Sequence, residues 1–270
     1  MRESFVRFFA FSEAPFSKEI LDGDLWLPAS KQSVVDVLCE ACHDRSQVLL
    51  VGEPGAGKTC VLRALRHCLP QAGFRLTYCH NATLGKRDFY RQLCLALGLN
   101  PSATAAAVFY AISTHVQDLG RERIHPVFLL DEAHLLHQDT LDHLHILLNY
   151  EWDSRALLSL ILVGLPDLQD RLELRRNRSF YSRLDRRLSL DPMSAADIGE
   201  YVRMRLHRAG CDHEIFGSEA LALLHEAAPS SLRDIDRLAT AALREAADRK
   251  KKLIERDVLA HVLELDRRNN

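Results

Sequence analysis

The residues with the clearest chemical pattern lie between positions 52 and 59, in the order Gly52-Glu-Pro-Gly-Ala-Gly57-Lys58-Thr59. Glycines at this spacing let backbone amides turn towards phosphate oxygens, because no side chain stands in the way. Lys58 would reach the β- and γ-phosphates, and the Thr59 hydroxyl would bind magnesium. The pattern therefore predicts a phosphate loop that holds ATP together with Mg²⁺.

The sequence on either side of this loop fits that interpretation. Val48 to Val51 is an unbroken apolar run, which predicts a strand buried on both faces, and Leu62, Leu65 and Leu69 follow at helical spacing. The order strand, loop, helix is the context that the motif requires, and the helix directs its positive end at the phosphates. We assign these residues to the nucleotide-binding loop: Gly52, Glu53, Pro54, Gly55, Ala56, Gly57, Lys58, Thr59 and Cys60.

A second chemical pattern is a pair of acids after an apolar run, in Pro126-Val-Phe-Leu-Leu-Asp131-Glu132. A strand here would deliver Asp131 to the magnesium shell beside Thr59. Glu132, one residue further on, can polarise a water for attack on the γ-phosphate. We therefore expect Thr59 and Asp131 to hold the metal and Glu132 to be the general base. Asp131-Glu-Ala-His134 also matches a helicase motif, but 270 residues leave no room for the second nucleotide-binding domain that such helicases need.

The composition sets limits on the class of protein. The 270 residues, 47% of them hydrophobic, suffice for one substantial core and a small accessory domain. No apolar run approaches the ~18 residues of a membrane helix, and the N-terminus lacks a signal peptide's apolar core. We therefore expect a cytoplasmic protein with no membrane partner, its seven cysteines being reduced thiols. The formal net charge of -2 argues against a uniformly basic surface and leaves room for a local basic patch.

The order of elements predicts the fold. Strands are expected at 48–51, 75–80, 126–130, 157–163 and 187–190, with helices between them. After Asp191-Pro192 the pattern becomes helical only, at 195–209, 218–227, 231–248 and 255–266. We therefore expect an α/β nucleotide-binding domain at 46–190, a parallel sheet flanked by helices, and a small all-helical lid domain at 191–270. The aromatic-rich segment 1–45 is expected to pack on the ATPase core, although its phenylalanines suit contact with an adenine as well.

Two side-chain clusters allow more than one interpretation. His134, His137, His143 and His145 invite a zinc site, but they share an amphipathic helical pattern with several leucines, which favours surface and core histidines. Between 171 and 187 the arginines outnumber the acids. Such a run of charge usually forms a solvated face. Because this one follows a strand of a nucleotide-binding sheet, the alternative is that part of it faces phosphate. The arginines are Arg171, Arg175, Arg176, Arg178, Arg183, Arg186 and Arg187.

Taken together, these motifs resemble the AAA+ ATPases, and more closely their ExeA-like branch. The resemblance rests on the two motifs above and on more particular ones: Phe8-Phe9-Ala-Phe, Pro15-Phe16-Ser17, Leu162-Val-Gly-Leu-Pro-Asp-Leu, Tyr181-Ser-Arg-Leu and Tyr201-Val-x-x-Arg205-Leu-x-x-Ala-Gly. It covers about residues 5 to 250.

The resemblance implies roles for three arginines. Arg233 matches the lid arginine that touches the γ-phosphate. Arg178 or Arg183 would be the finger that reaches a neighbouring subunit's nucleotide, so that hydrolysis depends on assembly. Two departures bear on the rate. Leu165 stands where relatives carry a polar first-sensor residue, and Ser230-Ser231-Leu232 replaces the usual Gly-x-Pro before the lid arginine. Slow or partner-gated hydrolysis would follow.

Within this branch the sequence suggests two functions. Secretion ATPases of the ExeA type carry a membrane segment and a cell-wall-binding domain after the lid, where this chain ends. It is more similar to the DNA-transposition regulators of the TnsC, TniB, MuB and IstB type. That similarity implies ATP-dependent assembly on double-stranded DNA as a homo-oligomeric ring or helical filament, with six or seven subunits per turn, and recruitment of a transposase.

The contacts to DNA would be made to phosphates without reading bases. Lys86 and Arg87, in the loop expected after the second strand, are the candidates, although an ordinary charged helix start explains them as well; Arg121 and Arg123 are weaker candidates. The alternative function is a nucleotide-gated scaffold for secretion machinery or another protein complex. A metabolic phosphate-loop kinase is disfavoured, because it has no use for the lid and finger arginines.

Overall fold

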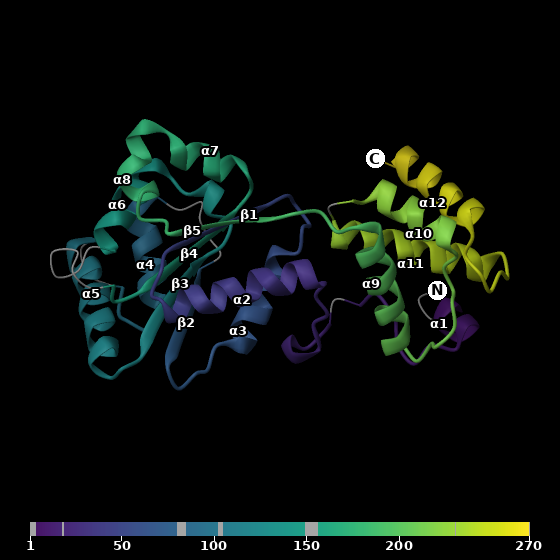
Figure 1. The fold of residues 1–270 in the computed structure, drawn as a ribbon, viewed down its shortest axis with the longest axis horizontal. Coiled ribbons are helices and arrows are strands. Elements are labelled where there is room, and N and C mark those ends of the chain that lie inside the picture. Colours follow the sequence, from purple (N-terminus) through teal and green to yellow (C-terminus); the bar gives the residue numbers. More distant parts are fainter. Residues whose placement is uncertain are drawn as a thin grey trace. The chain divides into compact units, whose positions relative to one another are not determined.

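A computed structural model describes residues 4–17, 19–79, 85–101, 105–148, 156–229 and 231–269. The contacts divide the chain into two compact units, drawn as ribbons in Figure 1. The sheet unit comprises Ser30–Gly52 and Lys58–Leu190. The helical unit comprises Met1–Ala29, Glu53–Gly57 and Asp191–Asn270. The middle of the phosphate loop is therefore grouped with the helical unit, and its two ends belong to the sheet unit.

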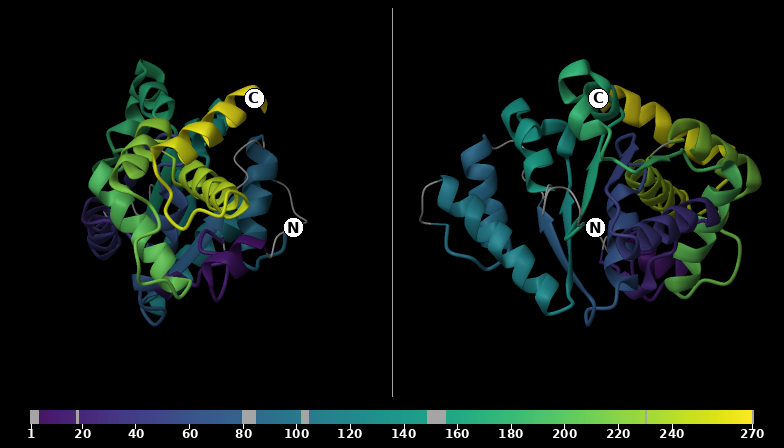
Figure 2. Two further views of the ribbon diagram at one scale, coloured as in Figure 1. Left: turned by 90° about the vertical axis from the view of Figure 1, so that its right-hand side faces the viewer. Right: turned by 60° about the vertical axis from the view of Figure 1, so that its left-hand side comes forward.

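The sheet unit is built on five parallel strands in the order β2-β3-β4-β1-β5. The right-hand view of Figure 2 shows this sheet with helices on both faces. The strand positions confirm the predicted α/β class, each within two residues of its expected bounds. The strands are β1 (Val48–Gly52), β2 (Phe74–Cys79), β3 (His125–Leu130), β4 (Ser159–Gly164) and β5 (Arg186–Leu190).

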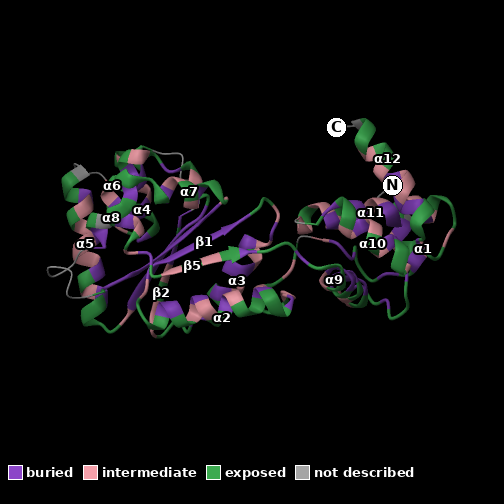
Figure 3. Ribbon diagram, turned by 45° about the horizontal axis from the view of Figure 1, so that its top comes forward, coloured by how far each residue is buried: buried purple, intermediate pink, exposed green. Residues whose placement is uncertain are grey.

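Strands β1, β3 and β4 are buried along their whole length, as Figure 3 shows for β1. A parallel strand covered by helices on both faces is mostly apolar, and the two polar residues that begin β3 and β4, His125 and Ser159, are buried as a pair with His125 Nε2 2.9 Å from Ser159 Oγ. Strand β4 lies between β1 and β3, with Leu49 opposite Leu162 and Leu129 opposite Ile161. The end of β4 therefore separates the start of the phosphate loop from the Asp131–Glu132 pair.

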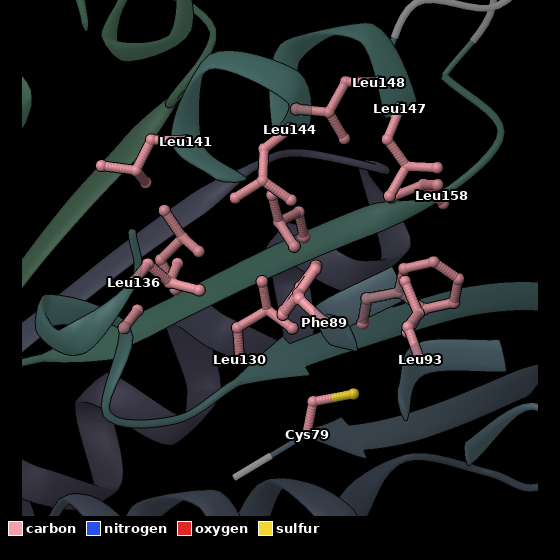
Figure 4. Packing of buried hydrophobic residues seen from close by; sticks show 14 of the residues in the cluster. Cys79, Phe89, Leu93, Leu130, Leu136, Leu141, Leu144, Leu147, Leu148 and Leu158 are labelled. Carbon is pink, nitrogen blue, oxygen red and sulfur yellow. The ribbon is translucent and has the colours of Figure 1, made fainter. Parts of the chain in front are cut away.

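The helices of the sheet unit are α2 (Ala29–His43), α3 (Lys58–Cys68), α4 (Lys86–Ala96), α5 (Ala105–Arg121), α6 (Gln138–Leu147), α7 (Asp167–Glu173) and α8 (Arg178–Tyr181). Leucines of α6 pack over the sheet against Leu130, Leu158 and Phe89 (Figure 4). The amphipathic pattern expected from 134 to 148 divides into a 3₁₀ turn, η2 (Ala133–Leu135), and α6. Lys86 and Arg87 open α4 and do not lie in the loop expected there.

The helical unit contains the four helices expected after residue 191, each within three residues of its expected bounds: α9 (Ala195–Arg208), α10 (Ser218–Ala227), α11 (Leu232–Asp248) and α12 (Arg256–Asn269). Within the residues that the structure describes, every helix is too short or too polar to span a bilayer.

The N-terminal aromatic residues join the core of this helical unit. Helix α1 (Ser4–Phe9) packs on α11, and Phe5, Phe9, Phe11 and Phe16 are buried with Ile198 and Leu243. The division of contacts thus differs from the expected packing of residues 1–45 on the ATPase core: Met1–Ala29 group with the helical unit, and only Ser30 onwards groups with the sheet. The aromatics fit here because α9 and α11 present apolar faces to them.

A buried arginine joins two of the sequence motifs, Pro15-Phe16-Ser17 and Tyr201-Val-x-x-Arg205. Arg205 on α9 is only 3% exposed. Its Nε donates to the carbonyl oxygen of Pro15 at 2.7 Å, and its Nη1 donates to the Tyr201 hydroxyl at 2.8 Å. Its Nη2 donates to the carbonyl of Ser17, and its guanidinium lies 5.7 Å from the centre of the Phe16 ring. The Pro-Phe-Ser and Tyr-x-x-x-Arg motifs are therefore the two halves of one contact.

Candidate nucleotide site

The phosphate loop has a backbone that only glycine adopts readily at two of its positions. Gly55 has φ 82° and Gly57 has φ 92°, both in the left-handed region. Between them, the Ala56 amide donates to the carbonyl oxygen of Glu53 at 3.1 Å. Helix α3 begins at Lys58, so Thr59 and Cys60 lie in its first turn, the helix end with partial positive charge. The backbone of this turn therefore favours glycine at positions 55 and 57.

Lys58 is held close to the loop. Its side chain is buried, and Nζ donates to the carbonyl oxygen of Gly52 at 2.7 Å. An ammonium group carries three donors, and burying its charge is costly unless it is paired. A phosphate oxygen is a suitable further partner for such a group. The side chain of Thr59, one residue further on, is exposed to solvent.

Within the helical unit, the middle of the loop contacts the start of α11. The Leu232 amide donates to the carbonyl oxygen of Gly55 at 3.1 Å. Ser231 caps α11, its Oγ accepting from the Asp234 amide at 3.1 Å. A Cβ atom at Gly55 would lie 2.4 Å from that same Oγ. Ser231, which departs from the pattern of relatives, therefore serves as a helix cap, and position 55 has no room for a side chain.

Asp131 lies at the carboxyl end of β3, and protein groups donate to both of its carboxylate oxygens. The Tyr78 hydroxyl on β2 donates to Oδ2 at 2.8 Å, and the Glu132 amide donates to Oδ1 at 2.9 Å. Asp131 is 6% exposed. Burial and the neighbouring Asp131 raise the pKa of Tyr78 above its ordinary value, so the phenol stays a hydrogen-bond donor at any ordinary pH.

Glu132 has φ 52° and ψ 34°, a left-handed backbone that a non-glycine residue seldom adopts. Its side chain is half exposed, and Oε2 lies 3.5 Å from His134 Nδ1. Such strained backbone persists where the surroundings hold it, often at functional sites. Here the Glu132 amide is held by the Asp131 carboxylate, and its carbonyl accepts from the Leu135 amide at 2.9 Å.

The oxygen donors at this edge of the sheet suit a magnesium ion. Mg²⁺ prefers carboxylate, hydroxyl and water ligands. Asp131 supplies a buried carboxylate that has no Lys or Arg ion pair among the residues described, and Thr59 supplies an exposed hydroxyl. The residue types therefore fit the expected metal, with Asp131 and Thr59 as the residues that would hold it.

The predicted arginines have different surroundings. Arg178 is exposed at the start of α8, Arg183 is partly buried, and Arg233 is exposed in the first turn of α11. Three other arginines of the 171–187 run make contacts inside the sheet unit. Arg171 donates to the carbonyl of His134 at 3.2 Å, Arg186 pairs with Glu40 and Asp44, and Arg187 stacks on Tyr181 at 4.0 Å. Part of this run is thus structural.

The four candidates for DNA contact fall into two groups. Lys86 and Arg87 follow the carboxyl end of β2, and Lys86 Nζ lies 3.0 Å from His143 Nε2. Arg121 and Arg123 precede the amino end of β3, and Arg121 pairs with Asp118 at 2.7 Å. Because β2 and β3 run parallel in register, these are opposite edges of the sheet. One surface therefore does not collect all four side chains.

Sequence reasoning missed two neighbours of the acidic pair, Tyr78 and His134. The sequence predicts Tyr78 in a strand, and no motif gives it a function. A search for polar side chains at the carboxyl end of the strand beside β3 would have found it, because parallel strands end at the same edge of a sheet. For His134, the sequence patterns suggest only a zinc ligand, a helicase-motif residue or an ordinary surface or core histidine. Its contact with Glu132 depends on the left-handed backbone of Glu132, which no sequence pattern predicts.

Comparisons with known proteins agree with this fold. Residues 42–172 match the family described as AAA domain. General secretion pathway protein A of Aeromonas hydrophila is 34% identical over 224 residues, which are 82% of this chain and 41% of that protein. The chain thus spans less than half the length of this relative.

Solved structures with the same fold include two DNA-bound complexes. Drosophila ORC bound to DNA has a TM-score of 0.69 at 19% identity and covers 96% of this chain and 65% of that chain. Aeropyrum pernix ORC1 in complex with DNA has a TM-score of 0.66 at 19% identity, with coverages of 94% and 69%. The Thermotoga maritima RuvB branch migration motor has a TM-score of 0.58 at 16% identity, with coverages of 93% and 73%.

At these identities the structures establish the fold alone: a parallel five-stranded P-loop AAA+ sheet with a helical C-terminal region. Part of this chain is thus similar to the AAA domain family and to general secretion pathway protein A, and the described structure has the fold of these solved proteins.

Proposed function

We propose that this chain binds ATP with magnesium and hydrolyses it to ADP and phosphate. The observation that carries the proposal is the pairing of a glycine-turned phosphate loop, with Lys58 buried against it, and an Asp131–Glu132 pair at the end of β3. Lys58 binds the β- and γ-phosphates, and Thr59 with Asp131 holds the metal. Glu132 takes a proton from the attacking water. Magnesium, when bound, neutralises charge on the phosphate oxygens.

Assembly is proposed to control this reaction. Arg178 is the better placed of the two finger candidates, because it is exposed at the start of a short helix, whereas Arg183 is partly buried. A long exposed guanidinium is suited to reach the nucleotide of a neighbouring subunit and to stabilise charge in the transition state. Arg233, exposed in the first turn of α11, is proposed as the lid arginine that senses the γ-phosphate.

The proposed use of this ATPase is regulation of DNA transposition: the ATP-bound chains assemble on duplex DNA and engage a transposase. Support comes from the motifs shared with the transposition regulators and from a fold that also occurs in structures solved with DNA. The second candidate is a nucleotide-gated scaffold for a secretion complex. It is favoured by the 34% identity to general secretion pathway protein A.

The deciding experiment is sedimentation of the purified protein with duplex DNA, with ATP, with a slowly hydrolysed analogue and without nucleotide. A large complex that needs both nucleotide and DNA supports the regulator. Assembly that needs nucleotide and is unaffected by DNA at low salt supports the scaffold.

Two variants test the ATPase activity on which both functions depend. Lys58→Ala should abolish nucleotide binding, and Glu132→Gln should bind ATP and trap the assembled state. Unchanged ATP affinity in the first, or wild-type turnover in the second, contradicts the assigned role.

A further inference from the structure

The end of β4 lacks the polar group that would be expected beside an attacking water. Gly164 ends the strand and Leu165 follows it, at the position where a first-sensor side chain is expected. The side chain of a leucine cannot donate or accept a hydrogen bond. Another polar side chain near this strand end is therefore needed if the water and its base are to be held in place.

The turn η2 packs directly on this strand end. A Cβ atom at Gly164 would lie 3.2 Å from the backbone nitrogen of His134 and 2.8 Å from a Leu168 side-chain carbon. The glycine is thus required so that η2 can approach. Arg171 also contacts the turn, because its Nη1 donates to the carbonyl oxygen of His134 at 3.2 Å. His134 therefore lies beside the end of β4, with its amide nitrogen packed close to Gly164 and its carbonyl oxygen bound by Arg171.

The imidazole of His134 points a nitrogen at Glu132. The side chain is 11% exposed, and Nδ1 lies 3.5 Å from Glu132 Oε2. Within the described ranges Nδ1 is buried and has no hydrogen-bond partner of good geometry. A buried polar atom without a partner is costly, and in apo structures catalytic hydrogen bonds are often longer than in the working complex. The Glu132 carboxylate is the group that a small movement would bring into hydrogen-bond range.

We propose that His134 is a positioning residue for Glu132, compensating for the apolar Leu165. Its Nδ1 holds Oε2, so that Oε1 faces the attacking water. The proposal rests on the ATPase activity proposed above. In that reaction Glu132 takes a proton from water and the water oxygen bonds to the γ-phosphorus. The bond from that phosphorus to the oxygen shared with the β-phosphate breaks. A base displaced by even ~1 Å is expected to lose rate strongly.

Three substitutions at position 134 separate positioning from packing. His134→Asn keeps a nitrogen near the place of Nδ1, His134→Gln moves it towards the place of Nε2, and His134→Leu removes it. We expect kcat to fall about 10-fold in His134→Leu and in His134→Gln, and less than about 3-fold in His134→Asn, with binding of a fluorescent ATP analogue unchanged. If His134→Leu does not fold, the comparison of His134→Asn with His134→Gln still tests the proposal. Equal turnover in Asn and Gln overturns the proposal.

A second readout does not depend on turnover. The contact between His134 and Glu132 should be detectable in the imidazole ¹⁵N spectrum of the nucleotide-free protein. The chemical shift of His134 Nδ1 should differ between wild type and Glu132→Gln. An identical signal overturns the proposal. In a Glu132→Gln background, His134→Leu should cost no further activity, since there is no base left to position. If wild type hydrolyses no ATP while the ¹⁵N signal responds to Glu132→Gln, the contact stands and the proposed function fails.

Discussion

Tyr78 on β2 donates a 2.8 Å hydrogen bond to Oδ2 of Asp131, the carboxylate at the end of the neighbouring strand β3. The other oxygen, Oδ1, accepts from the Glu132 amide. One carboxylate thus ties three residues of the site together: it is oriented by Tyr78, and it holds the backbone of the proposed base. Each carboxylate oxygen has a second lone pair, so both remain able to accept from water around a metal ion.

Removing the Tyr78 hydroxyl should weaken the response to magnesium. In Tyr78→Phe, Asp131 loses the partner that fixes its orientation. The Mg²⁺ concentration needed for half-maximal binding of a fluorescent ATP analogue should then rise by about 10-fold, as for other residues that support a metal ligand. Binding without Mg²⁺ should not change. Tyr110→Phe, which removes an exposed hydroxyl from α5, is the matched control. The same Mg²⁺ dependence in Tyr78→Phe and wild type would show that the hydrogen bond has no such role.

Alanine should destabilise the protein more at position 55 than at position 98, where a glycine has a similar backbone conformation. Gly55 and Gly98 have φ 82° and 75°, so alanine at either adds strain of ~1 kcal/mol. A Cβ at Gly98 meets nothing within 4 Å, whereas at Gly55 it meets Ser231 Oγ at 2.4 Å and Ser231 Cα at 2.8 Å. Gly55→Ala should therefore lower the free energy of unfolding by about 1 to 3 kcal/mol more than Gly98→Ala.

Urea unfolding of both variants measures this difference. Ser231→Gly combined with Gly55→Ala removes the side-chain part of the clash and should recover part of the loss. Equal destabilisation of Gly55→Ala and Gly98→Ala would mean that the contact between the loop and the start of α11 contributes nothing to stability.

Much of the fold was predictable, because the strongest patterns have one physical cause. A strand covered on both faces is mostly apolar, so the unbroken apolar runs at 48–51 and 126–130 predict strands that the structure places at Val48–Gly52 and His125–Leu130. The contacts that complete the site were less accessible. Gly55 meets Ser231 through a tertiary fold that pairs distant segments. The aromatic N-terminus could have filled either hydrophobic core, and only the apolar faces of α9 and α11 decide which.

The stability of the protein should decrease below neutral pH through His125. This histidine on β3 is 8% exposed, and its Nε2 lies 2.9 Å from Ser159 Oγ. Burial, and to a lesser extent the positive Arg45, lower its pKa from 6.5 to about 4. Between these values the unfolded chain binds a proton that the folded chain does not. The free energy of unfolding should thus fall as the pH drops from 6.5 towards 4, by an amount on the order of 2 kcal/mol.

Other groups titrate in the same range, so the measurement is a comparison. His125→Gln keeps a nitrogen near Nε2 for the contact with Ser159 but cannot take up the proton. Urea unfolding at pH 7 and pH 4.5 should show a smaller loss of stability in His125→Gln than in wild type. Parallel pH dependence in the two proteins would exclude His125 as a source of the acid sensitivity.

The two groups of basic residues lie near opposite ends of the parallel strands, so substituting each group tests which end of the sheet binds DNA. Each phosphate contact that is lost reduces the slope of log affinity against log salt by about one. Arg87→Ala removes an exposed arginine and should reduce the slope by about one. Lys86→Ala with Arg87→Ala should reduce the slope by up to about two, the Lys86 share being the smaller because its Nζ also contacts His143. Arg121→Ala with Arg123→Ala, at the opposite edge of the sheet, should leave the slope unchanged. Filter binding to one duplex over a series of salt concentrations, with a slowly hydrolysed ATP analogue present, measures the slope for all three variants.

Two outcomes would contradict this assignment. If the slope changes only in the Arg121 and Arg123 variant, DNA binds at the amino ends of the strands. If it changes in neither double variant, neither surface binds DNA.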